Sequence, residues 1–226
     1  MSDYSRQTEC FNPEKFNIPI NIIGCGATGS AVALLLAKLG VSSPIHLWDF
    51  DTIEEHNIPN QQFTKEDIGK KKVDACSELI KKVHPATANV IMHDVCLGKE
   101  NPERLIGYVF ILTDTMASRS IIFNTCLKNN FSVPLVIETR MGLEMCMIYN
   151  YNPVSSSQTK EYLKTLYKDE ESVESLCGIS QTVAPSAMIT ASYAVWQMIK
   201  HFNKEEEFDN EIIFDFKYNN LLTRRF

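Results

Sequence analysis

The feature that most constrains this chain is a glycine-rich turn between an apolar segment and a segment rich in alanine and leucine. Its glycines are Gly24, Gly26 and Gly29, in the pattern Gly-x-Gly-x-x-Gly. In a strand–turn–helix unit the first glycine permits the tight turn, the second lets the backbone approach a phosphate, and the third lets the helix pack on the strand. The turn therefore predicts an α/β fold that binds a nucleotide or a dinucleotide.

The residues that follow the turn agree with a nucleotide site. The helix is expected to begin near Ala27 and Thr28, so that its first N–H groups point toward a bound anion. A second apolar segment then leads to Asp49, about twenty residues beyond the last glycine, where an acid commonly accepts hydrogen bonds from ribose hydroxyls.

The rest of the chain continues the alternation of strands and helices. Strands are expected at residues 18–23, 44–48, 88–92, 108–112 and 134–137, and helices at 28–39, 65–83, 117–129 and 187–202. Residues 142–151 and 211–216 indicate further strands, the first more typical of antiparallel pairing. Apolar strands that alternate with helices form parallel sheets covered on both faces. We therefore predict an α/β, Rossmann-like, mainly parallel sheet with helices on both faces, continued by antiparallel strands.

Length and regularity predict a single domain. A chain of 226 residues suits one α/β domain, and we expect residues 1–226 to form it. Residues 1–15 are expected to be an N-terminal arm. Residues 152–182 show no clean period, which indicates a flexible crossover loop with room for one short helix.

Charge and cysteine content argue against several classes of partner. The net charge of −6 offers no basic field for a phosphate backbone, which makes nucleic acid a poor partner. There is no basic-then-apolar leader and no apolar run of membrane-spanning length, so we expect neither secretion nor a membrane. The seven cysteines include no Cys-x-x-Cys pair, which suits reduced thiols in a cytoplasmic protein and gives no support to a zinc site.

Several short motifs surround the glycine turn in a fixed order. They are Tyr4-Ser5-Arg6-Gln7 before it and, after it, Asp49-Phe50-Asp51, Asn57-x-x-Asn60-Gln61, Gly69-x-x-Lys72 and Asp114-x-x-x-x-Arg119. This ordered set resembles the ThiF/MoeB/HesA family, the adenylating proteins related to ubiquitin-activating enzymes. The resemblance covers about residues 4–150 and, more weakly, residues 177–200.

The resemblance implies an adenylyltransferase that uses ATP and Mg²⁺ and releases pyrophosphate. The activated group would be the C-terminal carboxylate of a ubiquitin-like or sulfur-carrier-like protein or of a peptide. By resemblance Asp49 would hold the ribose, Lys72 would neutralise triphosphate charge, and Asp114 would hold Mg²⁺, which prefers carboxylate and phosphate oxygens. The whole chain would then be one ThiF-type adenylation domain.

The resemblance also assigns roles to four further residues. Asn57 would contact a phosphate or the attacking carboxylate, and Gln61 would lie beside the nucleotide. Arg6 would reach the γ-phosphate bound to a neighbouring subunit, which implies a homodimer. Cys177 stands where some family members carry a cysteine that bonds the activated carrier, and the alternative interpretation is an inert cysteine at the approach to a helix. Asp51 is best explained as a cap of the turn that follows it.

Asn60 departs from the family pattern, which has arginine before the glutamine. An amide offers neither the charge nor the fork of donors of a guanidinium. Either Lys70, Lys71 or Arg6 compensates, or the chain is an ATP-binding pseudoenzyme or scaffold. Two further alternatives stay open, namely a family member that activates an RNA-borne or small-molecule carboxylate, and an NAD-dependent oxidoreductase built on the same glycine motif.

Overall fold

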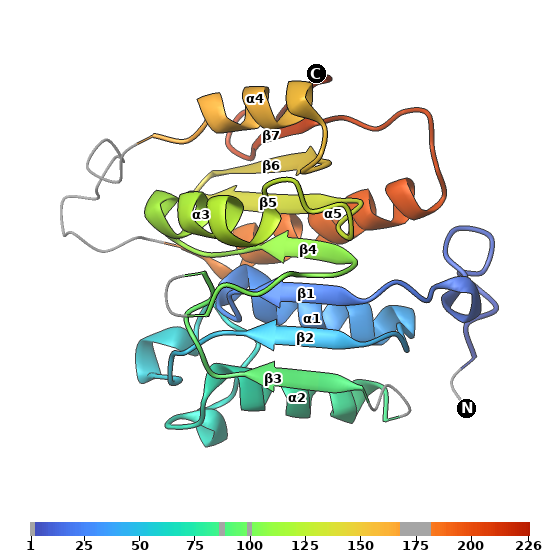
Figure 1. Cartoon of the computed structure of the whole chain (residues 1–226). Coiled ribbons are helices and arrows are strands. Elements are labelled where there is room, and N and C mark those ends of the chain that lie inside the picture. The colour runs from blue at the N-terminus through green and yellow to red at the C-terminus, as the bar shows by residue number, and fades with distance from the viewer. Residues whose placement is uncertain (1–2, 86–88, 99–100, 168–181) are drawn as a thin grey trace.

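The computed structural model describes residues 3–85, 89–98, 101–167 and 182–226. These residues form one mixed sheet with helices on both faces (Figure 1). The sheet has eight strands in the order β3-β2-β1-β4-β5-β6-β7-β8. The strands are β1 (Ile20–Ile23), β2 (Ile45–Trp48), β3 (Val90–His93), β4 (Tyr108–Ile111), β5 (Val136–Met141), β6 (Met145–Tyr151), β7 (Glu211–Asp215) and β8 (Asn220–Arg224).

Strand direction confirms the predicted fold class. Strands β1 to β5 pair in parallel, whereas β6, β7 and β8 follow as antiparallel neighbours. Strand β8 was not predicted, because a run of polar and exposed residues at 217–226 carries no alternating pattern. It closes the sheet as the outer half of a β7–β8 hairpin.

The helices lie on both faces of the sheet, with α3 in front of it and α1, α2 and α5 behind it in the view of Figure 1. The α-helices are α1 (Ala27–Leu39), α2 (Lys72–Val83), α3 (Met116–Ile122), α4 (Ser156–Lys164) and α5 (Ala184–Phe202). Shorter turns are the 3₁₀ helices η1 (Pro13–Lys15), η2 (Glu55–Asn57) and η3 (Lys65–Asp67), and the π-helical η4 (Phe123–Leu127) that continues α3. Helix α4 is the short helix expected within residues 152–182.

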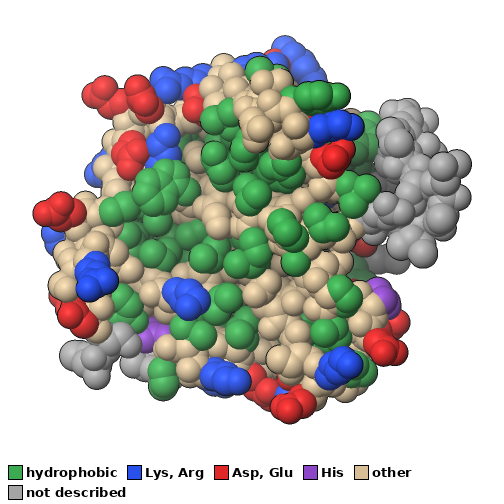
Figure 2. Space-filling model, turned by 180° about the vertical axis from the view of Figure 1, so that it is seen from behind, with side chains coloured by type: hydrophobic (Ala, Val, Ile, Leu, Met, Phe, Trp, Pro, Cys, Tyr) green, Lys and Arg blue, Asp and Glu red, His purple; other side chains and the backbone are tan. Residues whose placement is uncertain are grey.

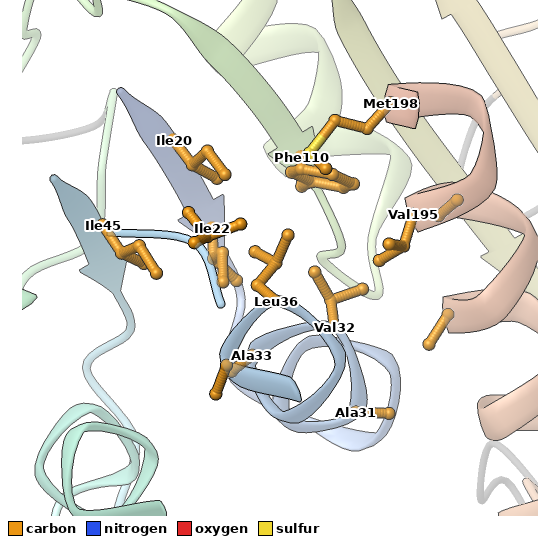
Figure 3. Close-up of a cluster of buried hydrophobic side chains, with 14 of the residues drawn as sticks. Ile20, Ile22, Ala31, Val32, Ala33, Leu36, Ile45, Phe110, Val195 and Met198 are labelled. Carbon is orange, nitrogen blue, oxygen red and sulfur yellow. The ribbon is translucent and has the colours of Figure 1, made fainter. Parts of the chain in front are cut away.

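The main core lies between the sheet and the α1–α5 layer. Ile20 and Ile22 of β1 point toward Leu36 of α1, and Phe110 of β4 meets Met198 of α5 (Figure 3). Strands β1 and β4 are buried along their whole length because a second apolar cluster covers the other face. This double coverage explains why both strands are almost entirely apolar. It also fixes their carboxyl ends, from which the site is built.

Two predicted elements begin later in the chain than expected. The helix predicted at 65–83 starts only at Lys72, since Gly69 lies in the left-handed region at φ 89° and separates η3 from α2. The strand predicted at 142–151 starts at Met145, because Gly142 donates its N–H to the Met145 carbonyl oxygen in a turn (2.9 Å).

The face that carries α1 and α5 has a broad apolar surface (Figure 2). Helix α5 and strand β8 expose large apolar side chains, among them Trp196, Leu221 and Leu222. Leu222 is 65% exposed. Among the described residues, no helix combines the length and the apolar character that crossing a membrane requires.

Candidate functional site

The glycine turn has the geometry that its pattern predicts. Gly24 lies at φ 93°, and a Cβ there would be 2.7 Å from the Leu112 carbonyl oxygen. A Cβ on Gly29 would collide with the Gly24 carbonyl oxygen. A Cβ on Gly26, by contrast, would meet no atom within 4 Å among the described residues beyond its chain neighbours. The first and third glycines are therefore required by the fold, whereas the second keeps space open in front of the turn.

Helix α1 starts at this open space. Gly26 is its N-cap and supplies no side chain, so no side-chain hydrogen bond caps the helix. The first turn, which contains Ala27 and Thr28, carries no acidic residue. A helix N-terminus of this kind favours a bound anion through its N–H groups and its dipole. The beginning of α1 is therefore suited to a phosphate group.

Asp49 is fixed against the turn by two backbone donors. Its Oδ2 accepts from the Cys25 N–H at 2.6 Å, and its Oδ1 accepts from the Asp51 N–H at 2.8 Å. Burial raises the pKa of the Asp49 carboxyl, although these two hydrogen bonds and the nearby Lys72 oppose the shift. Each carboxylate oxygen can accept a second hydrogen bond. Asp49 can therefore hold the turn and bind hydroxyl groups at the same time.

Lys72 and Asp51 form an ion pair next to Asp49. The Lys72 Nζ lies 2.7 Å from the Asp51 Oδ2, and the lysine is buried while the Asp51 side chain is 48% exposed. The backbone adds a hydrogen bond from the Lys72 N–H to the Asp51 carbonyl oxygen (3.0 Å). The turn that follows Asp51 is capped by Glu54. The capping role expected for Asp51 is therefore wrong, and its carboxylate holds the lysine instead.

Asp114 lies in the segment that follows β4, and its side chain is exposed. Leu112 and Thr113, just before it, are close to the position of a Cβ on Gly24, so this segment lies directly against the glycine turn. Arg119 donates to the backbone carbonyl oxygens of Thr113 and Asp114. Among the described residues, no group of three or more His, Cys, Asp or Glu side chains is arranged to hold a metal ion.

The segment from Asn57 to Gln61 lies beside the beginning of α1, since the Gln62 N–H donates to the Ser30 Oγ (3.1 Å). Asn57 is buried and accepts from the Glu54 N–H (2.9 Å). The Asn60 amide donates to the Thr182 Oγ1 (2.5 Å). Within the described residues, the Asn60 Oδ1 and the Gln61 Oε1 are buried without a hydrogen-bond partner.

Two of the residues proposed to compensate for Asn60 are paired with acidic side chains. Lys70 pairs with Asp67 and Glu78, at 3.0 and 2.7 Å. Lys71 lies 3.0 Å from Asp94. Both lysines therefore belong to surface ion pairs.

Arg6 is exposed and lies far from the glycine turn of its own chain. Its neighbour Gln7 donates to the Leu39 carbonyl oxygen (2.8 Å), at the opposite end of α1. The arm lies at the amino-terminal ends of the parallel strands (Figure 1). Arg6 can therefore serve a nucleotide site only in another copy of the chain. Cys177 lies outside the described residues.

Sequence reasoning missed a buried acid behind the site. Glu138, on β5, is 0% exposed and lies between Arg119 and Arg140. Arg119, part of one of the sequence motifs, is thus an ion-pair partner of this acid. An acid and a base inside a strand that is otherwise buried, at Glu138 and Arg140, were the signals that could have revealed the cluster.

The Rossmann-like sheet, the open glycine turn at an uncapped helix and the adjacent acid and lysine define an α/β protein whose turn is suited to a nucleotide. The chain belongs to the ThiF family, whose family model matches residues 14–225. This match covers most of the chain and confirms the family that the ordered motifs indicated.

Individual relatives agree with this assignment. The chain is 31% identical over 135 residues to an adenylyltransferase and sulfurtransferase of Aspergillus niger, covering 58% of this chain and 27% of that protein. It is 25% identical over 182 residues to the sulfur carrier protein ThiS adenylyltransferase of Escherichia coli, covering 79% and 70%.

The fold is similar to that of E. coli MccB. Its crystal structure with AMPCPP and the MccA peptide gives a TM-score of 0.71 at 18% identity, covering 92% of this chain and 64% of that one. MccB has also been solved with ATP, and that structure gives a TM-score of 0.68. The chain thus spans 27% of the Aspergillus protein's length and 64% of the MccB chain.

Proposed function

We propose that this protein is an adenylyltransferase, which uses ATP to activate a carboxylate and releases pyrophosphate. The observation that carries the proposal is the open space at Gly26, where an uncapped helix N-terminus lies next to the Asp49 carboxylate and the Lys72 ammonium. A phosphate fits the helix N-terminus, ribose hydroxyls fit the Asp49 carboxylate, and triphosphate charge fits the Lys72 ammonium. MccB, which shares the fold, has been solved with ATP.

The proposed chemistry depends on charge neutralisation and positioning. A carboxylate attacks the α-phosphorus, its oxygen forms the new P–O bond, and the bond to pyrophosphate breaks. Lys72 leaves Asp51 to neutralise the negative charge that develops on the phosphate oxygens. The exposed Asp114 would supply one carboxylate ligand to Mg²⁺, whose other ligands would be phosphate oxygens and water. No proton transfer from a side chain is needed.

The proposed acceptor is a C-terminal carboxylate of a ubiquitin-like or sulfur-carrier-like protein or of a peptide. The relatives support this range, since one is named for the sulfur carrier ThiS and another was solved with the peptide MccA. The six cysteines that the structure describes are all free, which suits a protein working in the reducing cytoplasm.

We also propose that the active form is a homodimer. Arg6 lies at the opposite end of α1 from the glycine turn, so it can contribute to catalysis only from a neighbouring subunit. The apolar surface over α1 and α5 (Figure 2) offers an area that a second copy could cover. Sedimentation of the purified protein would test the assembly directly.

A second candidate function is nucleotide binding without turnover, and one observation favours it. Asn60 replaces a charged residue, and its amide donates to Thr182. An ATP-binding scaffold would keep Asp49 and the glycine turn for binding, but without the arginine's charge it would not turn ATP over.

Exchange of labelled pyrophosphate into ATP tests the main proposal. The protein is incubated with ATP, Mg²⁺, labelled pyrophosphate and a set of carriers and peptides with free C-terminal carboxylates. Exchange that depends on the carboxylate is expected. ATP binding without any exchange would instead identify the scaffold, and preferential binding of NAD would contradict both.

A further inference from the structure

The buried cluster around Glu138 is connected to the Asp114 segment through Arg119. The Glu138 carboxylate is fully buried, and the buried Arg119 and Arg140 flank it. The Arg140 Nε and Nη2 donate to Glu138 at 2.8 and 3.1 Å. The Arg119 Nε lies 3.1 Å from the Glu138 Oε1, close enough for an ion pair although it is not aligned for a hydrogen bond.

Stability alone does not explain this arrangement. Two guanidinium groups share one carboxylate, so a net positive charge is buried. Apolar side chains of similar volume are often at least as stabilising as a buried ion cluster. The reason for the cluster is therefore better sought in what the two arginines hold at their other ends.

The two arginines hold different parts of the chain. Arg119 donates from Nη2 to the carbonyl oxygens of Thr113 and Thr139, and from Nη1 to that of Asp114 at 3.4 Å. Arg140 donates instead to the Thr165 carbonyl oxygen and hydroxyl, at 2.7 and 2.9 Å. Thr165 ends α4, whereas Thr113 and Asp114 lie against the glycine turn.

We propose that Arg119, anchored by Glu138, is a positioning residue for Asp114. The fork of the guanidinium fixes two consecutive carbonyl groups, and so the backbone from which the Asp114 carboxylate projects toward the nucleotide. A further hydrogen bond holds the same segment, because the Ser118 Oγ donates to the Thr113 Oγ1 (2.8 Å). This proposal rests on the proposed function, in which Asp114 is a ligand of the Mg²⁺ bound to ATP.

The cluster supplies a matched control. Arg119→Gln and Arg140→Gln each remove one guanidinium and leave Glu138 in a balanced pair with the other. Both variants are therefore expected to fold and to lose similar thermal stability. Only Arg119→Gln releases the Asp114 segment.

The experiment measures ATP affinity by calorimetry, once with Mg²⁺ and once with EDTA. The difference between the two affinities depends on the position of Asp114 and does not require turnover. We expect Arg119→Gln to reduce the gain in affinity from Mg²⁺ by about tenfold or more, as for a lost hydrogen bond to a charged group, with little change in EDTA. Arg140→Gln should keep the wild-type gain. If Arg119→Gln does not fold, Arg119→Lys, which keeps the charge and loses the fork, is measured with the same expectation.

The outcomes distinguish a failure of the positioning role from a failure of the proposed function. An unchanged Mg²⁺ gain in the Arg119 variant, or an equal loss in Arg140→Gln, would overturn the positioning role and leave the proposed function intact. A wild-type protein that binds ATP equally with and without Mg²⁺ would contradict the metal role of Asp114, and the positioning role with it.

Discussion

The Lys72 ammonium lies 2.7 Å from the Asp51 carboxylate, at the start of helix α2, which follows the glycine turn and Asp49 in the chain. The pairing keeps a buried lysine compensated while no triphosphate is bound. It also predicts an exchange of partners, in which the lysine turns from a protein carboxylate to a phosphate. Because the Asp51 side chain is 48% exposed, water can solvate that carboxylate after the exchange.

Replacing Lys72 should therefore affect catalysis far more than replacing its partner. We expect Lys72→Met to lower carboxylate-dependent pyrophosphate exchange by about a hundredfold or more, the range found when one charge-stabilising group is removed. Asp51→Asn keeps the lysine charge and should change the rate by less than about tenfold. Lys70→Met, which alters a surface lysine, is the matched control and should leave exchange intact. Equal losses in the Lys70 and Lys72 variants would refute the assigned role.

Substitutions of two glycines in the turn should affect thermal stability and ATP binding to different extents. Among the described residues, Gly26→Ala places a methyl group where no atom beyond the chain neighbours lies within 4 Å, although the backbone at φ −76° and ψ −143° lies outside the regions that alanine favours. We expect a small fall in melting temperature and ATP affinity weakened by about tenfold or more, by analogy with the loss of good hydrogen bonds to a charged group. Gly24→Ala, at φ 93° and against the Leu112 backbone, should lower the melting temperature much further. Calorimetry and thermal unfolding of both variants test this, and an unimpaired Gly26→Ala would place the phosphates elsewhere.

A substitution at Asn60 should distinguish a slow enzyme from an ATP-binding scaffold. Asn60→Arg restores a charged fork next to the beginning of α1, although it loses the hydrogen bond to Thr182. If the chain is a slowed enzyme, pyrophosphate exchange should rise by about tenfold, since an added arginine can stabilise phosphoryl charge by that much or more. Asn60→Lys serves as the control for charge without a fork. No exchange in any of the three proteins would favour the scaffold.

Acid should destabilise the β2–β3 edge of the sheet. Burial lowers the pKa of His46 below 6.5, with the neighbouring His93 adding to the effect, and burial also lowers the pKa of His93. An unfolded chain therefore binds more protons below that range than the folded one, so stability is present above pH about 6.5 and falls as pH drops below it. We expect the melting temperature to fall between pH 7 and pH 5. His93→Gln should reduce that slope, whereas the exposed His56→Gln should not.

Much of the site could be predicted from sequence because it depends on local pattern. Gly24, Gly26 and Gly29 serve a single turn, and Asp49 follows it at a spacing set by one βαβ unit. The pairing of Lys72 with Asp51 could not be predicted, because it depends on how the loop between β2 and α2 folds back on itself. In the same way Glu138 meets Arg119 only after β4 and β5 pair in the sheet.

The limits of the fold prediction have related causes. Strand β8 has no periodic pattern because it lies at an edge, where neither side needs to be apolar. The helix predicted from residue 65 was wrong over residues 65–71 because Gly69 adopts a left-handed conformation, which a periodic pattern does not reveal. Central strands, by contrast, carry their own signal, since burial on both faces demands apolar residues throughout.

The indole of Trp48 stacks on the His93 ring with centroids 3.6 Å apart and an interplanar angle of 4°. Trp48 also directly precedes Asp49 in the chain, and the only other tryptophan is Trp196, far from it on α5. The intrinsic fluorescence of the unlabelled protein is thus an optical reporter, whose emission would respond to quenching by imidazolium and to a ligand bound beside Asp49.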